Sequence, residues 1–225
     1  MTSLNLLCLP VFLFGAVVGS FLNVCIVRIP RGDSIVHPPS HCPDCKTVIR
    51  YYDNIPLVSY IALLGRCRSC GETISSRYFF VELLMGSLAV ALYCQFGFSL
   101  AFLVSFVFVA ALIVISFIDL DVRIVPDVIS LPGIVAGLLF SVVARYVISD
   151  PFELIPSPLS ALIGVLVGGG FLLALAWAYE AFTGVEGMGG GDIKLLAMIG
   201  AFLGWTSIPF TLLASLTGSV IGLGS

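Results

Sequence analysis

This sequence is short of charged residues. Only 10% of its 225 residues are Asp, Glu, Lys or Arg, while 59% are hydrophobic. Soluble domains contain about 25% charged residues, which cover the surface that meets water. The composition therefore excludes an ordinary soluble protein and predicts a polytopic protein embedded in a lipid bilayer. Basic patches and nucleic-acid motifs are also lacking, so no nucleic-acid partner is expected, and nothing in the sequence indicates an oligomeric state.

The N-terminus lacks the basic residues that begin a cleavable signal peptide, although its first 27 residues are largely apolar. Seven of the ten Lys and Arg residues lie instead within residues 28–77. Short loops rich in Lys and Arg remain on the cytoplasmic side of a membrane. We therefore expect residues 1–27 to form the first transmembrane helix, with its N-terminus outside, and residues 28–78 to form a cytoplasmic loop.

Long uncharged runs predict the remaining transmembrane helices. The run at residues 83–118 is long enough for two helices, with a break at the CQFGFS segment of residues 94–99. Runs at 128–146 and 158–179 predict one helix each, and the run at 195–225 predicts two. The expected fold class is an all-α polytopic membrane protein with about seven transmembrane helices and one small cytoplasmic loop domain.

Two CxxC pairs, separated by 21 residues, predict a metal site in the loop: Cys42, Cys45, Cys67 and Cys70. This zinc-ribbon-like pattern supplies four thiolates to a tetrahedral Zn²⁺ and leaves no open position, so the zinc would be structural. The alternative is disulfides or free thiols, and a cytoplasmic loop in a reducing compartment disfavours disulfides. His37 and His41 flank the pairs, and we interpret them as ordinary loop residues.

Two aspartates are expected at the same membrane face. Asp119 follows a 21-residue uncharged helix and Asp192 precedes another, and counting helices places both on the cytoplasmic side. Two carboxylates held close share one proton, so one can take a proton from water while the other donates to a peptide carbonyl. This chemistry predicts an aspartyl protease, with Asp121 as the alternate for Asp119. The alternative is that acidic residues simply flank membrane helices.

A glycine-rich connector precedes the second aspartate. The glycines at 189–191 permit backbone conformations and close approaches that a side chain would forbid, so an extended substrate would fit against them. Lys194 is expected to reach the interface or to balance nearby acid. Glu82, near the start of the second predicted helix, is either structural or lines the substrate path.

Six motifs resemble those of type IV prepilin peptidases. They are GSFLNVCIVRIP at 19–30, HCPDC at 41–45, DNIPLVSYIALLGRCRSC at 53–70, ISSRYFFVELL at 74–84, FIDLDVRIVPD at 117–127 and GMGGGDIKLLAMIGAFLGW at 187–205. The resemblance implies a GxGD-type intramembrane aspartyl protease of the bacterial inner membrane. Such an enzyme cuts the basic leader from prepilins and pseudopilins at the cytoplasmic face. Many members then methylate the new N-terminus with S-adenosylmethionine.

Carried over by position, the resemblance implies that Asp119 and Asp192 are catalytic. Asp192 closes a GxGD motif that contains Gly189 and Gly191, and Asp119 stands seven residues before Pro126. Residues 79–225 would then form the transmembrane aspartyl protease domain. The four loop cysteines match those of family members that carry the zinc loop.

Two departures from the family pattern are present. Phe79 stands where the family usually has proline, and little consequence is expected. The chain also ends at Ser225 within a predicted span, where family members usually continue, so a C-terminally short protease domain is expected.

Other functions remain open on the residues alone. A GxGD protease with a preflagellin-like or presenilin-like substrate would share the aspartates but generally lacks the cysteine loop. A carboxylate-coupled transporter would place its acidic groups near the bilayer midplane rather than at one face. A membrane scaffold that binds a partner through its zinc loop leaves the glycine-rich connector unexplained.

Overall fold

A computed structural model of the chain describes residues 2–148, 155–184, 189–209 and 211–213. Within these ranges the regular elements are helical, and the only strand-like pairings are two isolated β-bridges, which agrees with the predicted all-α fold. The chain divides into two compact units, Met1–Arg123 and Ile124–Ser225, which are described separately.

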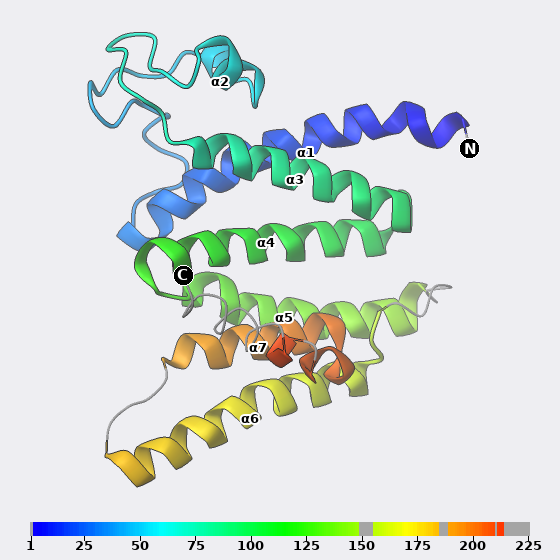
Figure 1. Cartoon of the computed structure of the whole chain (residues 1–225). Helices are drawn as coiled ribbons and strands as arrows, with labels where there is room; N and C mark the ends of the chain where they lie inside the picture. Colours follow the sequence, from blue (N-terminus) through cyan, green and yellow to red (C-terminus); the bar gives the residue numbers. More distant parts are fainter. Residues whose placement is uncertain (1, 149–154, 185–188, 210, 214–225) are drawn as a thin grey trace. The chain divides into compact units, whose positions relative to one another are not determined.

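Three long helices form the first unit: α1 (Thr2–Arg28), α3 (Ser76–Phe96) and α4 (Leu100–Val122). They lie side by side in Figure 1, with α3 packed on α1 and α4 on both. The loop between α1 and α3 contains only short elements, namely η1 (Ile29–Arg31), η2 (Tyr51–Asp53) and α2 (Val58–Ala62). The loop therefore rests on one end of a three-helix layer.

Serine caps and one glycine set the bounds of α3 and α4. The hydroxyl of Ser75 accepts from the N–H of Arg77, and that of Ser99 accepts from the N–H of Phe102. These bonds satisfy backbone donors that a helix N-terminus leaves unpaired. Gly97, with a φ of +60°, ends α3 in a conformation that favours glycine. The break between the two helices lies where the sequence predicted it, at residues 94–99.

The contact between α1 and α3 depends on small residues. A Cβ added at Gly15 would lie 2.7 Å from the Cβ of Ala89, and one added at Gly19 would lie 2.8 Å from the Cα of Glu82. Small residues four apart let helix backbones approach closely in membranes, where packing rather than the hydrophobic effect holds helices together. The G-x-x-x-G pair of α1 therefore fixes α3 at close range.

The second unit contains α5 (Asp127–Val143), the π-helical turn η3 (Ala144–Ile148), α6 (Pro158–Thr183), α7 (Gly190–Leu203) and η4 (Trp205–Ser207). α7 packs against both α5 and α6. The hydroxyl of Ser157 accepts from the N–H of Ser160 and caps α6, and Gly184, with a φ of +70°, ends it. Buried Leu172, Leu196 and Ile208 form an apolar cluster among α6, α7 and η4.

The backbones of α6 and α7 are in direct contact. A Cβ added at Gly164 would lie 2.3 Å from the carbonyl oxygen of Gly200, and the reverse substitution meets the carbonyl of Gly164 at the same distance. One turn further along α6, a Cβ at Gly168 would lie 2.8 Å from the carbonyl oxygen of Leu196. Larger residues at these positions would force the helices apart, so the glycines set the position of α7.

Five helical segments among the described residues are long and apolar enough to cross a membrane: Leu7–Arg31, Ser76–Phe96, Leu100–Val122, Asp127–Tyr146 and Pro158–Thr183. They match the first five predicted spans, although α3 begins at Ser76, earlier than the uncharged run at 83. α7 has 14 residues, and most of the predicted seventh span lies outside the described residues. The count of seven spans and the outside N-terminus stay predictions.

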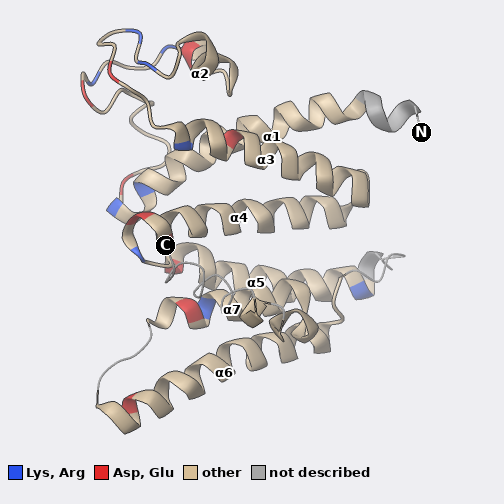
Figure 2. Ribbon diagram, viewed as in Figure 1, with Lys and Arg blue, Asp and Glu red and all other residues tan. Residues whose placement is uncertain are grey.

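Charged residues gather at the ends of the helices (Figure 2). In the first unit they lie on the loop, at the C-terminal ends of α1 and α4 and at the N-terminal end of α3, all on one side of the layer. In the second unit the acidic residues that the structure describes lie at the start of α5, the end of α6 and the start of α7. Each unit therefore has a charged end at which one of the predicted catalytic aspartates is found.

Candidate functional site

The four loop cysteines converge as the CxxC spacing predicted. Their Sγ atoms all lie within 4.8 Å of one another. The Sγ–Sγ distance is 3.8 Å between Cys42 and Cys70 and 4.0 Å between Cys45 and Cys67. A tetrahedral zinc with Zn–S bonds of about 2.3 Å requires Sγ–Sγ separations of about 3.8 Å. The arrangement therefore fits a tetrahedral four-thiolate metal site, and neither His37 nor His41 belongs to the cluster.

The two CxxC segments fold as copies of one turn. In the first, the N–H of Cys42 donates to the carbonyl of Thr47, and the N–H of Lys46 donates to the carbonyl of Cys42, both at 3.0 Å. The second segment repeats both bonds 25 residues later, at 2.8 and 2.9 Å. The residue after each pair has a positive φ, +59° at Lys46 and +76° at Gly71. The sequence revealed the cysteine pairs but not the repeated turn around them.

Local hydrogen bonds favour the thiolate form, which is the form that binds a metal, at two of the cysteines. The hydroxyl and backbone N–H of Thr47 stabilise the Cys45 thiolate and lower its pKa to about 6. The backbone N–H of Cys70 lowers the pKa of Cys67. The pKa of Cys70 is raised to about 12, because burial and the other thiols outweigh the stabilising N–H of Glu72. Four negative sulfurs repel one another, and a divalent cation would remove that penalty.

Arginines hold the loop in shape. Arg68 binds the carboxylate of Asp53 with two nitrogens at 2.7–3.0 Å, and this pairing lowers the pKa of Asp53. Arg28, at the end of α1, donates to the carbonyls of Ser34 at 2.8 Å and Pro38 at 2.7 Å. The second cysteine turn is therefore tied to η2, and the first part of the loop to α1.

Two polar side chains are buried between α1 and α3. Glu82 is 7% exposed, and its Oε2 accepts from the N–H of Leu57 at 2.7 Å. Asn23 is 1% exposed, and its Nδ2 donates to the carbonyls of Tyr78 and Gly19 at 3.1 and 3.3 Å. Of the two roles considered for Glu82, these contacts favour the structural one, because its carboxylate joins the loop to α3.

The structure separates the two candidate aspartates at the end of α4. Asp121 forms an ion pair with Arg77, in the first turn of α3. Residues two apart on a helix are rotated by about 200°, so Asp119 lies on nearly the opposite side of α4. Asp119 is exposed, and among the described residues no ion pair involves it. Both aspartates are exposed, and the ion pair with Arg77 engages Asp121.

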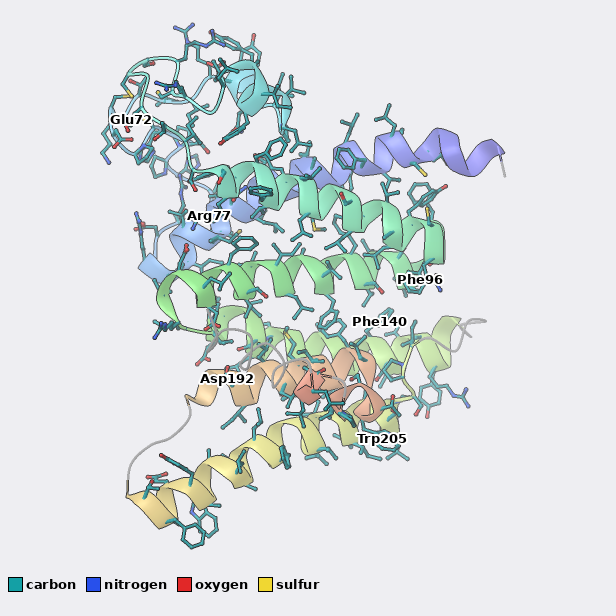
Figure 3. The ribbon with its side chains drawn as sticks, in the orientation of Figure 1. Glu72, Arg77, Phe96, Phe140, Asp192 and Trp205 are labelled. Atoms are coloured by element: carbon teal, nitrogen blue, oxygen red, sulfur yellow. The ribbon has the colours of Figure 1, made fainter. Side chains whose placement is uncertain are left out.

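Asp192 lies in the first turn of α7 and is exposed (Figure 3). The partial positive charge of a helix N-terminus favours a carboxylate at this position. Lys194, two residues on, pairs its Nζ with both carboxylate oxygens of Asp127 at 2.7 and 2.8 Å. Lys194 thus balances nearby acid, which was one of its two expected roles, and ties the start of α7 to the start of α5.

The glycines before Asp192 differ in their surroundings. A Cβ added at Gly191 would lie 2.8 Å from the Cβ of Val125, so a close approach requires glycine there. No described atom lies within 4 Å of a Cβ added at Gly189 or Gly190. Of the proposed reasons for this glycine run, close packing therefore applies to Gly191.

The predicted pair Asp119 and Asp192 belongs to two different units. The structure shows each aspartate exposed at a helix end within its own unit. The dyad that they would form stays a prediction.

Comparison with protein families gives two adjacent matches. Residues 13–96 match the bacterial peptidase A24 N-terminal domain, and residues 106–223 match the type IV leader peptidase family. The first match contains the cysteine loop, and the second contains all three of the aspartates considered above. No solved structure matches the chain.

Several curated proteins named prepilin leader peptidase/N-methyltransferase are similar over most of the chain. The Aeromonas hydrophila protein is 38% identical, covering 95% of this chain and 79% of the relative. The Neisseria gonorrhoeae protein is 37% identical over 93% of this chain and 77% of the relative, and the Myxococcus xanthus protein is 42% identical over 94% and 61%. The chain therefore belongs to the type IV leader peptidase family.

Proposed function

We propose that this chain is a prepilin peptidase, which removes the leader peptide from prepilins and pseudopilins with Asp119 and Asp192. The observation that carries the proposal is the similarity, along 95% of the chain, to a protein named for this activity. Two exposed aspartates at helix ends supply the chemical groups that the reaction needs.

In the proposed reaction, the two carboxyl groups share one proton. The ionised carboxylate takes a proton from a water molecule, whose oxygen attacks the scissile carbonyl carbon. The protonated partner donates to the carbonyl oxygen, and the carbon–nitrogen bond then breaks as the leaving amine takes up a proton. Apparent pKa values in such a pair belong to the pair rather than to either aspartate.

Asp119 is proposed over Asp121 because of the ion pair. Arg77 engages Asp121 and holds the end of α4 to the start of α3, which is a positioning role. Asp119, rotated by about 200°, keeps its carboxylate accessible. Gly189 and Gly191 complete the GxGD motif, with Gly191 positioned for its close contact with Val125.

The metal proposed for the loop is Zn²⁺, held by Cys42, Cys45, Cys67 and Cys70. A four-thiolate zinc has no open coordination position, so its contribution is to fold the loop. Each cysteine turn presents its two thiolates through the same backbone hydrogen bonds, and that rigidity supports a closed structural site.

We further propose that the chain methylates the amine that cleavage exposes, with S-adenosylmethionine as the methyl donor. Support comes from the second half of the relatives' name, N-methyltransferase. Transfer of the methyl group to the amine nitrogen would release one proton and the demethylated cofactor. Residues 28–78 are the part of the chain in which we would seek this activity.

The proposed location is the bacterial inner membrane, with the zinc loop and both aspartates at the cytoplasmic face. The seven Lys and Arg residues within 28–77 support this orientation. A prepilin has a basic leader followed by an apolar helix, so a site at the interface meets the junction between them.

The test is release of the leader from a tagged prepilin by the full chain in membranes, followed on a gel. The parent should cleave, whereas Asp119→Asn and Asp192→Asn should each lower the rate by at least about a hundredfold, as expected for loss of an acid–base group. Glu180→Gln, at the exposed end of α6, is the matched control and should cleave like the parent.

Cleavage by Asp192→Asn at the parental rate would overturn the aspartyl protease proposal. A carboxylate-coupled transporter, the alternative of a different class, predicts no leader release by any form of the chain. Methylation is read separately, as transfer of a labelled methyl group to a pilin that has already been cut.

A further inference from the structure

One edge of the loop is apolar and lies outside every candidate membrane span. Val58, Ile61 and Leu64 recur every third residue, and their side chains are 57%, 62% and 84% exposed. Ser59, on the other side of α2, is buried. These three side chains, called here the apolar edge, point away from the protein.

Two contacts place the apolar edge beside the first two turns of α3. The N–H of Leu57 donates to Glu82 at 2.7 Å, and the ring of Tyr60 lies 5.5 Å from that of Phe79. With α3 beginning at Ser76 and a rise of 1.5 Å per residue, Phe79 and Glu82 lie about 5 and 9 Å inside the helix end. Figure 1 shows α2 alongside the beginning of α3 rather than beyond it.

Through Phe79, these contacts also link α2 to the exposed apolar surface of a membrane span. Phe79 contacts Phe80 with ring centroids 6.0 Å apart, and Phe80 is exposed on α3. Residues 55–64 contain no charge, whereas Asp53 precedes them and Arg66 follows. Segments that lie in a membrane interface bury an apolar face about 5–10 Å into the lipid, with charged residues at the margin. The position and composition of this segment match that description.

We propose that residues 55–64 form an interfacial segment, whose apolar edge inserts into the lipid of the membrane that α3 crosses. The zinc loop is then anchored on the bilayer surface rather than projecting freely into water. The segment also covers the Glu82 carboxylate, and exposed Arg66, two residues after Leu64, lies where it contacts anionic lipid headgroups. The proposal requires only that α3 spans the membrane, and it does not depend on the peptidase chemistry.

The test uses tryptophan fluorescence of the full, zinc-loaded chain in phosphatidylcholine–phosphatidylglycerol vesicles. Trp177→Phe and Trp205→Phe remove the native tryptophans, and Leu64→Trp or Ile61→Trp then introduces a single reporter. Glu72→Trp is the matched control, on the part of the loop away from α2 (Figure 3). Zinc content, measured on each variant, confirms that its loop is folded.

Lipids brominated in the upper acyl chain should lower the emission of the tryptophans at 61 and 64 to about half, as expected at interfacial depth, and leave that at 72 unchanged. Equal, weak quenching at all three positions would overturn the proposal. So would blue-shifted emission at 61 and 64 without quenching by the lipid, because it would mean that protein, such as a second copy of the chain, covers the apolar edge. If only one of the Ile61→Trp and Leu64→Trp variants retains zinc, the quenching measured in that variant decides the question.

Discussion

The end of α4 and the start of α7 hold their acidic groups in a similar way. In each, the residue two positions after the proposed catalytic aspartate pairs with a neighbouring helix of the same unit. Asp121 pairs with Arg77 of α3, and Lys194 pairs with Asp127 of α5. Residues two apart lie on nearly opposite sides of a helix, so neither ion pair lies on the side of the helix that carries the aspartate before it.

The two ends differ in polarity and in packing. Asp192 lies at a helix N-terminus, where the partial positive charge favours a carboxylate, whereas Asp119 lies in a last turn, where helix carbonyls carry partial negative charge. Asp192 follows glycines, one of which packs tightly on Val125, while Asp119 follows an apolar helix. The end of α4 and the start of α7 are therefore held by similar ion pairs but are not equivalent electrostatically.

Among variants that keep both proposed catalytic aspartates, the largest effect is expected from Gly191→Val, which tests the packing at the start of α7. The new side chain would overlap Val125 and cost about 1–3 kcal/mol through overpacking, which displaces Asp192. Leader cleavage should fall by about tenfold or more. Gly190→Val is the matched control, since open space surrounds its Cβ among the described residues, and it should keep most of the activity. Equal loss in both would show that packing on Val125 is not the reason.

Zinc removal should destabilise the end of α4 and leave the start of α7 unchanged. The second cysteine turn is followed closely by Arg77, so an unfolded loop should weaken the support of Asp121 but not that of Lys194. We expect one zinc per chain by elemental analysis, its loss in Cys42→Ser, and its retention in Cys94→Ser, outside the cluster. A zinc content unchanged by Cys42→Ser would contradict the site.

Double-mutant cycles should rank the two ion pairs. The Arg77 and Asp121 side chains are 23% and 43% exposed, against 35% and 56% for Lys194 and Asp127. Less water around the first pair predicts a coupling free energy of about 1 kcal/mol, and roughly half of that for the second. The measurement is the unfolding free energy in detergent of each single and double variant, with Gln or Asn as replacements. A larger coupling free energy for Lys194 and Asp127 than for Arg77 and Asp121 would contradict this ranking.

The smallest effect is a pH dependence confined to the loop. Arg68 lowers the pKa of Asp53, so their pairing stabilises the folded loop at neutral pH and this stabilisation is lost as the pH falls through the lowered pKa. Asp53→Asn should lower the melting temperature slightly at pH 7, and its difference from the parent should vanish once the pH falls below the lowered pKa of Asp53. Comparing the two proteins at each pH removes the effect of zinc loss in acid. A difference that persists in acid would exclude this ion pair as its cause.

Local patterns allowed much of this structure to be predicted. Uncharged runs marked the first five spans, residues 94–99 marked the break before α4, and the CxxC spacing identified four cysteines that converge. Each of these signals lies within one short stretch of sequence. They reflect the exclusion of charge from lipid and the geometry of a cysteine turn.

Contacts between residues that are distant in the sequence could not be predicted from these local patterns. Arg77 and Asp121 are 44 residues apart, and Lys194 and Asp127 are 67 apart, so nothing local indicates their pairing. The charges of Arg77 and Glu82 also concealed the true start of α3 at Ser76, because a helix end at the interface tolerates charges that its centre does not. The backbone contact of Gly164 with Gly200 depends on helix packing, which composition does not show.

The most direct test of the account is the rate of leader release by Asp119→Asn beside that of Asp121→Asn, in the same membranes and with the same prepilin. The ion pair predicts that Asp119→Asn abolishes cleavage, while Asp121→Asn keeps a substantial rate and resembles Arg77→Gln. The reverse result, with Asp119→Asn active and Asp121→Asn inactive, would assign the catalytic role to Asp121 instead of Asp119.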